Sequence, residues 1–422
     1  METAAPRRLT ILTAGMLSLL CLTGCWDRVE IDQRGFIVAV AIDSPKKDTQ
    51  SGDGTDHQTK EQVEEPTGEQ SGQLSKKPRY SVTYQIVTPS GMRGTQNGDQ
   101  TGGKAYYHMV VQGRSMATMV AKLAQRTSRP PFFEHLKVII LSEEVARQGD
   151  QFADAIDFYL RESEMRRSTR IMVTRGKAAQ ILNTHPPEDR LPATYLELIS
   201  SNTKESSRIL PESRIGDVHE FLLKRESFVI QNVSDGNRAF STVSDAAVFS
   251  GQSKRLIGFL DGEETAGLNF LRGDIKGGQI DFQNGNEQGV FAIERMKRHL
   301  RASFGSNGLP SFKISIQVEG TLNETSYSQD TLAASTLHSM QEATAKEIKR
   351  LTEKTISKLQ QQYHCDVIGL GSYLHRKHYR KWQKLASKWE QGEQLFASSP
   401  IQVEMKVFIR RSGNIDRTEG SE

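Results

Sequence analysis

The chain has 422 residues, a formal net charge of +4 at neutral pH and 36% hydrophobic residues. This length exceeds one typical hydrophobic core, which excludes a single small domain and predicts two or three domains. The net charge is too small to indicate a nucleic-acid partner, and we predict none.

The N-terminal segment has the parts of a bacterial export signal. Two arginines precede an apolar stretch at 9–22, which is shorter than the roughly 20 residues that cross a bilayer. Residues 22–25 then read Leu-Thr-Gly-Cys, a lipobox whose cysteine thiol can accept a diacylglycerol thioether before the leader is cut. We predict a lipoprotein signal peptide at 1–24 and a mature N-terminus at Cys25, which carries S-diacylglycerol and N-acyl groups. The alternative is an ordinary signal peptide beside an unmodified Cys25.

The three cysteines leave no pair for an internal disulfide. Cys21 would leave with the leader and Cys25 would be blocked by lipid, so Cys365 alone stays as a free thiol. We interpret Cys365 as a small buried hydrophobic residue. The exported part must then be stabilised by core burial, and no later apolar run approaches membrane-spanning length.

Segment 25–199 predicts an N-terminal α/β domain. Its continuous apolar run at 36–42 is typical of a strand covered on both faces, and the alternation at 80–87 predicts a strand with one wetter face. Between these strands, 44–79 is polar and lacks aromatic residues, so we expect a disordered insertion there. Further expected elements are helices that begin at Ser115 and after Ser142, helices at 152–160 and 177–182, and strands at 137–141 and 170–174.

Segment 200–288 predicts a linker and a small middle domain. A polar stretch at its start indicates the linker. The expected elements are a helix at 215–223, a strand at 226–231 and a hairpin of 246–249 with 256–259.

Segment 289–413 predicts a C-terminal α/β domain. Two alternating strands, at 312–319 and 402–410, flank a long amphipathic helix at 331–363 that should pack across them. A second helical stretch is expected at 379–396, and residues 414–422 are expected to form a frayed tail. The predicted fold class is α+β with mixed α/β character, a multi-domain ectodomain of three domains in which mixed sheets pack against helices.

Sequence motifs for catalysis are absent. The chain has no Walker loop, HExxH, CxxC pair or Rossmann fingerprint. Segment 113–117 only weakly resembles a nucleophile elbow, and Ser115 is better explained as a helix cap. We interpret His135 as a hydrogen-bonded structural histidine and 369–371 as a turn that needs positive φ. We therefore predict no catalytic residue, no cofactor and no enzyme activity.

A basic cluster surrounds His375 and His378, whose spacing on a helix could bind a metal ion. Four cationic neighbours would repel a divalent ion, and no carboxylate lies among them, so we predict no metal site. These cations are Arg376, Lys377, Arg380 and Lys381. A solvated basic face is one interpretation, and contact with anionic lipid headgroups or an acidic partner is the other.

Several short motifs occur in order along nearly the whole chain. They are the lipobox running into 25–31 (CWDRVEI), the strand ending in Ile42 and Asp43, 80–86 (YSVTYQI), 134–137 (EHLK), 161–164 (RESE), 247–249 (AVF) with 256–258 (LIG), 366–371 (DVIGLG), and the helix of Trp382 and Trp389. Together they resemble the Ger(x)C family, the C-subunit lipoproteins of spore nutrient-germinant receptors. The insertion at 44–79 is unusually long for that family.

The resemblance implies a protein held by its lipid to the outer face of the spore inner membrane. There it would act with two integral-membrane partners, the A and B subunits, in the response to small nutrients. The resemblance implies no enzymatic activity and leaves open whether this subunit binds a germinant itself. From the residues alone, two other classes stay open: a solute-binding lipoprotein of a transporter, which usually has two similar lobes, and a lipid-anchored hydrolase.

Overall fold

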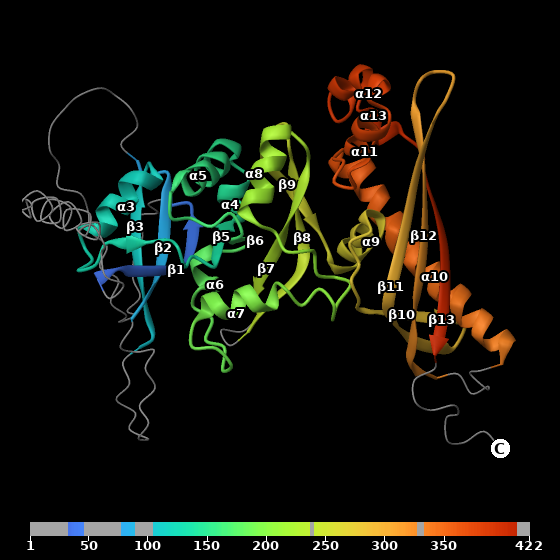
Figure 1. Cartoon of the computed structure of the whole chain (residues 1–422), viewed down its shortest axis with the longest axis horizontal. Helices are drawn as coiled ribbons and strands as arrows, with labels where there is room; N and C mark the ends of the chain where they lie inside the picture. Colours follow the sequence, from blue (N-terminus) through green and yellow to red (C-terminus); the bar gives the residue numbers. More distant parts are fainter. Residues whose placement is uncertain (1–32, 46–76, 89–103, 237–239, 327–332, 412–422) are drawn as a thin grey trace, which may run out of the picture.

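The computed structural model describes residues 33–45, 77–88, 104–236, 240–326 and 333–411, and it contains two mixed sheets packed against helices (Figure 1). The described elements follow the long axis of the molecule, with the first strands at one end and the C-terminal sheet at the other. The predicted mixed α+β fold class is confirmed. Cys25 and most of the insertion predicted at 44–79 lie outside the described residues.

The larger sheet has the strand order β3-β2-β1-β5-β6-β7-β8-β9, and the short β4 pairs with β1. Its strands are β1 (Gly35–Asp43), β2 (Tyr80–Val87), β3 (Tyr106–Gly113), β4 (Pro131–Phe132), β5 (Val138–Ser142), β6 (Arg170–Thr174), β7 (Phe228–Asp235), β8 (Ser241–Ser250) and β9 (Arg255–Leu260). Strands β1, β5, β6 and β7 run parallel to their neighbours in this series, whereas β2, β3, β8 and β9 pair in antiparallel fashion.

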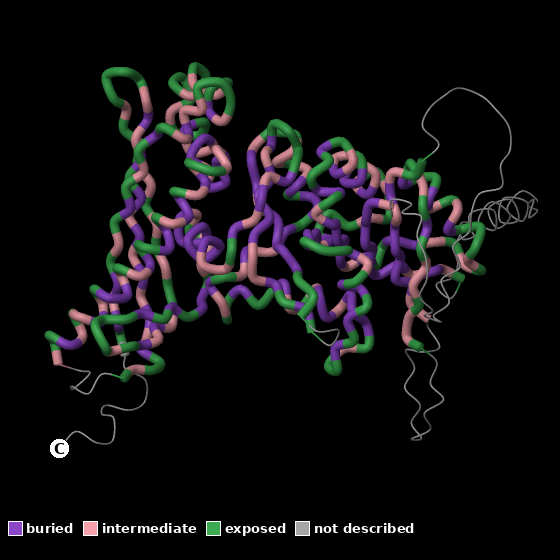
Figure 2. The backbone as a smooth tube through the Cα atoms, turned by 180° about the vertical axis from the view of Figure 1, so that it is seen from behind, coloured by how far each residue is buried: buried purple, intermediate pink, exposed green. Residues whose placement is uncertain are grey.

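Helices cover both faces of the larger sheet. They are α3 (Met116–Ala124), α4 (Glu143–Ala146), α5 (Gly149–Arg161), α6 (Ala178–Ile181), α7 (Pro192–Ile199) and α8 (Ile215–Lys224). Residues of α3, α4, α5 and α8 form one hydrophobic core against the sheet, whereas residues of α6 and α7 belong to a second core that contains other residues of β1 and β5. The sheet is therefore the middle of three layers, and Figure 2 shows its central strands as buried.

Strand β1 is covered on both faces, as its apolar run predicts: every residue from Ile37 to Ile42 is at most 4% exposed. The wetter face predicted for β2 is wrong, because Thr83 and Gln85 are buried as well. The Gln85 side-chain oxygen accepts a hydrogen bond from the backbone N–H of Ala193 in α7 at 3.1 Å. A polar residue can thus alternate with apolar ones and still be buried, once a distant helix satisfies its hydrogen bonds.

The larger sheet continues beyond residue 200. Strand β6 pairs with β7 in parallel at Val173 and Asn232, and β7, β8 and β9 extend the sheet in antiparallel fashion. The predicted hairpin of 246–249 with 256–259 is confirmed by the pairing of β8 and β9. The division into domains at residues 199 and 288 stays a prediction.

The smaller sheet has the order β10-β11-β12-β13. Its strands are β10 (Gln279–Asn284), β11 (Glu287–Phe304), β12 (Pro310–Thr325) and β13 (Ile401–Arg411). Strands β12 and β13 are parallel, so the chain between them must cross over, and it does so through α10 (Ala334–Lys358) and the helices that follow it. The alternating strands and the long helix predicted for this region are confirmed. Their buried faces meet: Ile314 and Val318 of β12 share one core with Met340 and Ile348 of α10.

Helix α10 ends in a π-helical turn (Leu359–Tyr363), which is followed by α11 (Leu370–Lys377), α12 (Tyr379–Leu385), a 3-10 turn (Ala386–Lys388) and α13 (Leu395–Ser398). The single helical stretch predicted at 379–396 is wrong. Gly392 and Gln394 take positive φ angles of 60° and 48°, which an α-helix cannot accommodate, so the segment breaks into short pieces.

Helix α9 (Gly262–Arg272) joins the two sheets, and sequence periodicity alone did not predict it. Its apolar residues share one core with β8 of the larger sheet and with the inner face of the smaller sheet. A Cβ added at Gly267 would lie 2.2 Å from the side-chain oxygen of Thr355 in α10. The backbones of α9 and α10 can approach this closely only because Gly267 has no side chain.

Candidate functional site at the junction of the two sheets

A buried carboxylate lies where the C-terminal helices meet the larger sheet. Asp366 follows the π-helical turn, and its carboxylate accepts backbone hydrogen bonds from Gly369, Leu370 and Gly371 at 2.9, 3.1 and 2.6 Å. The indole Nε1 of Trp389 donates a fourth bond at 2.8 Å. These donors satisfy a side chain that water barely reaches, since Asp366 is only 6% exposed.

A second carboxylate, Glu390, connects Asp366 to the larger sheet. Its Oε1 accepts a bond from the backbone N–H of Asp366 and its Oε2 accepts one from Ser227 Oγ, both at 2.6 Å. Ser227 immediately precedes β7, and its Oγ also accepts bonds from Gly251 N–H at 3.1 Å and from Cys365 Sγ at 3.3 Å. We define the Asp366 cluster as Ser227, Cys365, Asp366, Trp389 and Glu390.

Burial determines the protonation of the Asp366 cluster. Loss of hydration raises the pKa of Glu390 to about 7; the Ser227 hydrogen bond opposes this rise and the nearby Asp366 charge adds to it. Burial also raises the pKa of Asp366, against the donors that surround it. The same effect raises the pKa of the Cys365 thiol to about 12, so the thiol is protonated at neutral pH and is no nucleophile. The interpretation of Cys365 as a small buried residue is confirmed.

Two glycines let the chain wrap around Asp366. Gly369 has a φ of 86°, as the predicted turn requires. Gly371 does not have a positive φ, because it lies within α11. A Cβ added at Gly371 would lie 2.8 Å from ring atoms of both Trp382 and Trp389. The predicted positive φ is therefore confirmed at Gly369 and wrong at Gly371, where the constraint is the space taken by two indole rings.

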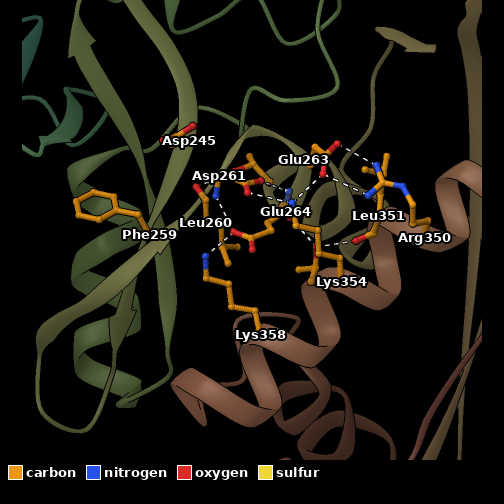
Figure 3. A network of polar contacts seen from close by, with 12 residues as sticks. Asp245, Phe259, Leu260, Asp261, Glu263, Glu264, Arg350, Leu351, Lys354 and Lys358 are labelled. Atoms are coloured by element: carbon orange, nitrogen blue, oxygen red, sulfur yellow. Dashed lines mark hydrogen bonds and ion pairs between the residues drawn. The ribbon is translucent and has the colours of Figure 1, made fainter. Parts of the chain in front are cut away.

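A network of ion pairs connects the start of α9 to α10 (Figure 3). Asp261 caps α9 and exchanges hydrogen bonds with Glu264 at 2.8 Å in both directions, a reciprocal capping box. Glu263 in the first turn pairs with Arg350 at 2.9 Å and with Lys354 at 2.7 Å, and these two cations hold the pKa of Glu263 at about 2. Acidic side chains at a helix N-terminus are also favoured by its positive dipole end.

The most buried pair of this network joins Glu264 to Lys358 at 2.6 Å, with side-chain exposures of 7% and 19%. Thr355 Oγ1 donates a further bond across the same contact to the backbone carbonyl of Glu264 at 2.8 Å. The network therefore fixes α10 against the segment that leads out of the larger sheet.

An open surface pocket of about 520 Å³ lies at the edge of this junction. Its lining includes the rings of Phe259 and Tyr363 and the cations Arg147, Arg175 and Lys358. Each of these cations already has a carboxylate partner: Glu143, Asp245 and Glu264, at 2.6, 2.9 and 2.6 Å. The pocket therefore offers no unpaired positive charge to which a solute could bind.

The other residues singled out from the sequence lie apart from the junction. Cys25 is outside the described residues, and its lipidation stays a prediction. Ser115 occupies the N-cap position of α3, but its side chain makes no capping bond. His135 is exposed and packs against the rings of Phe36 and Phe132, at 5.3 and 6.1 Å between centroids. It does not form the predicted hydrogen bond with any residue that the structure describes.

His375 and His378 end α11 and contact aromatic rings. His375 lies 5.4 Å from the Tyr379 ring, and His378 lies 5.4 Å from the Phe304 ring at the tip of β11. Within the ranges that the structure describes, no group of three or more His, Cys, Asp or Glu side chains is placed to hold a metal ion. In the same ranges, no helix combines the length and apolar composition needed to cross a bilayer.

Sequence reasoning missed the Asp366 cluster and the α9 network. The Asp-x-x-Glu spacing at 261–264 is a capping-box pattern that could have revealed the start of α9. Glu390 carries no comparable signal, because its partners Ser227 and Asp366 lie 163 and 24 positions away along the chain.

Comparison with known proteins covers both halves of the chain. Residues 27–234 match the family described as "Spore germination protein N-terminal domain", and residues 244–413 match "Spore germination B3/GerAC like, C-terminal". Spore germination protein YndF of Bacillus subtilis (strain 168) is 28% identical over 98% of this chain and 99% of its own length. Spore germination protein B3 of the same organism is 25% identical over 94% of this chain and 96% of its own.

The fold also has a relative among solved structures. The crystal structure of the GerBC protein matches with a TM-score of 0.56 and 23% identity, over 78% of this chain and 93% of that one. At this identity the likeness concerns the fold, and it agrees with the mixed sheets described above. The tandem family matches and the near full-length relatives confirm the resemblance seen in the short motifs: the chain belongs to the Ger(x)C, or GerAC-like, family of spore germination proteins.

Proposed function

We propose that this protein is the C subunit of a nutrient germinant receptor, required for spores to germinate in response to small nutrients. In this proposal a lipid on Cys25 tethers it to the outer face of the spore inner membrane, where it acts with integral-membrane A and B subunits. The observation that carries the proposal is the tandem match of 27–234 and 244–413 to the two domain families of spore germination proteins.

The geometry of the junction supports a non-catalytic role. Its buried carboxylates and thiol are engaged in internal hydrogen bonds that join distant parts of the chain. The Glu264–Lys358 pair and the shared core of α9 stabilise the same junction. An ectodomain stiffened in this way suits a subunit that positions or signals to its partners, because a displacement at one end moves the other.

The transporter and hydrolase alternatives have no supporting observation. Solute-binding lipoproteins usually have two similar lobes, whereas the two sheets here differ in strand number and order. The surface pocket at the junction is lined by charges that already have partners. We therefore do not assign germinant binding to this subunit.

Deletion of the coding gene tests the proposed function. Spores of the deletion strain should form normally but lose their response to one class of small nutrients, and the wild-type gene should restore it. A normal nutrient response in a strain without a paralogue would refute the proposal. Membrane subunits of the A and B type should also co-purify with a tagged copy of this chain from solubilised spore membranes.

The variant Cys25→Ala tests the anchor. Removing the thiol removes the nucleophile for lipidation, so the protein should leave the membrane fraction or persist with its leader uncut. The matched control is Cys21→Ala, which alters a leader cysteine outside the predicted acceptor position and should remain membrane-bound. Equal membrane association of both variants, each with its leader removed, would contradict lipidation at Cys25.

A further inference from the structure

Helices α11 and α12 carry a group of cations with no acidic residue among them. Between Asp366 and Glu390 the sequence has six Lys and Arg residues and no Asp or Glu. One of the six, Lys388, pairs with Glu393 at 2.6 Å. The other five form no ion pair with any described residue, and we define them as the basic tip: Arg376, Lys377, Arg380, Lys381 and Lys384.

The basic tip lies at the surface, at the upper edge of the C-terminal half of the molecule in Figure 1. All five of its residues are exposed, and Figure 1 shows α11 and α12 near the turn of the long β11–β12 hairpin. Phe304 of that hairpin contacts both Lys381, whose Nζ is 3.7 Å from the ring centroid, and the His378 ring. These contacts fix the helices beside the hairpin and leave the remaining cations directed to solvent.

An exposed aromatic side chain accompanies the cations. Tyr379, the first residue of α12, is 53% exposed, although a tyrosine of this size usually buries most of its ring. Tyrosines and basic residues are the side chains that accumulate at the interface between a bilayer and water.

The charges of the basic tip contrast with those at the junction. Arg350, Lys354 and Lys358 each pair with a carboxylate of the same chain. Neighbouring cations without such partners repel one another, a cost that an external anionic surface removes. The tip therefore has the charge pattern of a contact region for an anion outside the part of the chain that the structure describes.

We propose that the basic tip docks on the anionic headgroups of a lipid bilayer. The inference rests on the proposed function, in which lipid on Cys25 holds the ectodomain at a membrane. Two features favour a bilayer over an acidic protein. Three of the tip's five cations are lysines, a residue type depleted at protein interfaces, and they accompany an exposed tyrosine suited to the headgroup region.

Lysine labelling on vesicles tests this proposal with the whole lipidated chain. The protein is reconstituted into vesicles of phosphatidylcholine alone or with phosphatidylglycerol, and an amine-reactive reagent with mass spectrometry measures the labelling of each lysine. Lys377, Lys381 and Lys384 should be protected on the anionic vesicles, whereas Lys346 on the exposed face of α10 should label equally on both. Raising the salt from about 0.1 M to about 1 M shortens the screening length roughly threefold and should abolish the protection.

Charge variants make the test quantitative. Each Lys or Arg at an anionic membrane is worth roughly a fivefold change in binding, so neutralising three should shift docking by roughly a hundredfold. The variant R376Q/K377Q/R380Q should therefore lose protection at Lys384. The matched control R114Q/K204Q/K276Q removes three exposed cations elsewhere and should keep it. Circular dichroism of both variants checks that they fold.

Each outcome separates the tip from the anchor. Flotation on neutral vesicles reports the lipid on Cys25, independently of labelling. Equal labelling of the tip lysines on neutral and anionic vesicles overturns bilayer docking even if the protein floats. Protection that appears with soluble polyglutamate but not with anionic vesicles overturns it in favour of an acidic protein partner. Protection on anionic vesicles without flotation on neutral ones keeps the docking and refutes the anchor.

Discussion

Glu390 in the Asp366 cluster should make the stability of the protein depend on pH. The variant Glu390→Gln removes the charge but keeps the bonding pattern. Its amide oxygen can still accept the bond from Asp366 N–H, and its amide nitrogen can donate to Ser227 Oγ. The serine hydroxyl can then donate to Cys365 Sγ, whose thiol has a second acceptor in the Phe249 carbonyl. Differences from the wild type then report the buried charge and not a lost contact.

The expected change in the free energy of unfolding follows from the pKa of Glu390, which rises from an ordinary 4.5 to about 7 in the folded protein. Between these values the folded state binds more protons than the unfolded state, so the free energy of unfolding falls as pH rises through this window. At about 1.4 kcal/mol per pH unit, the wild type should lose about 3 kcal/mol between pH 4.5 and pH 7 because of this group. Glu390→Gln should match the wild type near pH 4.5 and exceed its stability by about that amount at pH 8.

Urea unfolding monitored by tryptophan fluorescence measures the difference in stability between the wild type and Glu390→Gln. Trp389 belongs to the Asp366 cluster, and Trp382 lies beside it at 5.7 Å between ring centroids. The matched control is Glu393→Gln on the same segment, whose side chain is 59% exposed and pairs with Lys388. Such a surface pair contributes at most about 1 kcal/mol, so the control should reproduce the pH profile of the wild type. Parallel profiles for the wild type and Glu390→Gln would refute the assignment of a buried charge at this position.

Two further predictions concern packing and pairing at the junction. Gly371→Ala should lower the melting temperature, at a cost of about 1–3 kcal/mol for overpacking, because the new Cβ would lie 2.8 Å from two indole rings. Lys358→Met should lower the free energy of unfolding by about 3–5 kcal/mol, because it leaves the Glu264 carboxylate buried and unpaired. The control Lys224→Met, in an exposed pair on α8, should leave unfolding unchanged. An unaltered melting temperature for Gly371→Ala, or equal effects of the two lysine variants, would contradict these packing and pairing arguments.

Local patterns predicted many elements of the fold with accurate bounds. The expected strands at 80–87 and 170–174 coincide with β2 and β6, and the apolar run at 36–42 lies within the buried β1. These predictions succeed because the burial of a regular element imposes a period on its own residues. Helix α9 was not predicted, because nearly all its residues are buried and the helix therefore has no amphipathic period to detect.

The site was less predictable than the fold. The motif at 366–371 indicated a turn with positive φ, but not that Asp366 is buried with four donors around it. The polar face of β2 indicated exposure, yet Gln85 is buried beneath α7. Three of the donors to Asp366 lie within the motif, but the fourth, Trp389, comes from a later segment, and the partner of Gln85 lies in α7. No local pattern carries the information on these distant partners.

The residues by themselves determine the strands and helices with strong periodicity, the lipobox at 22–25 and the family resemblance. Contacts between distant segments decide which charges are satisfied. The carboxylates of Glu264 and Glu390 find partners far along the chain, whereas the cations of the basic tip find none among the described residues. The physical reason is that hydration and pairing depend on the surroundings of a side chain in space, which its neighbours in sequence specify only in part.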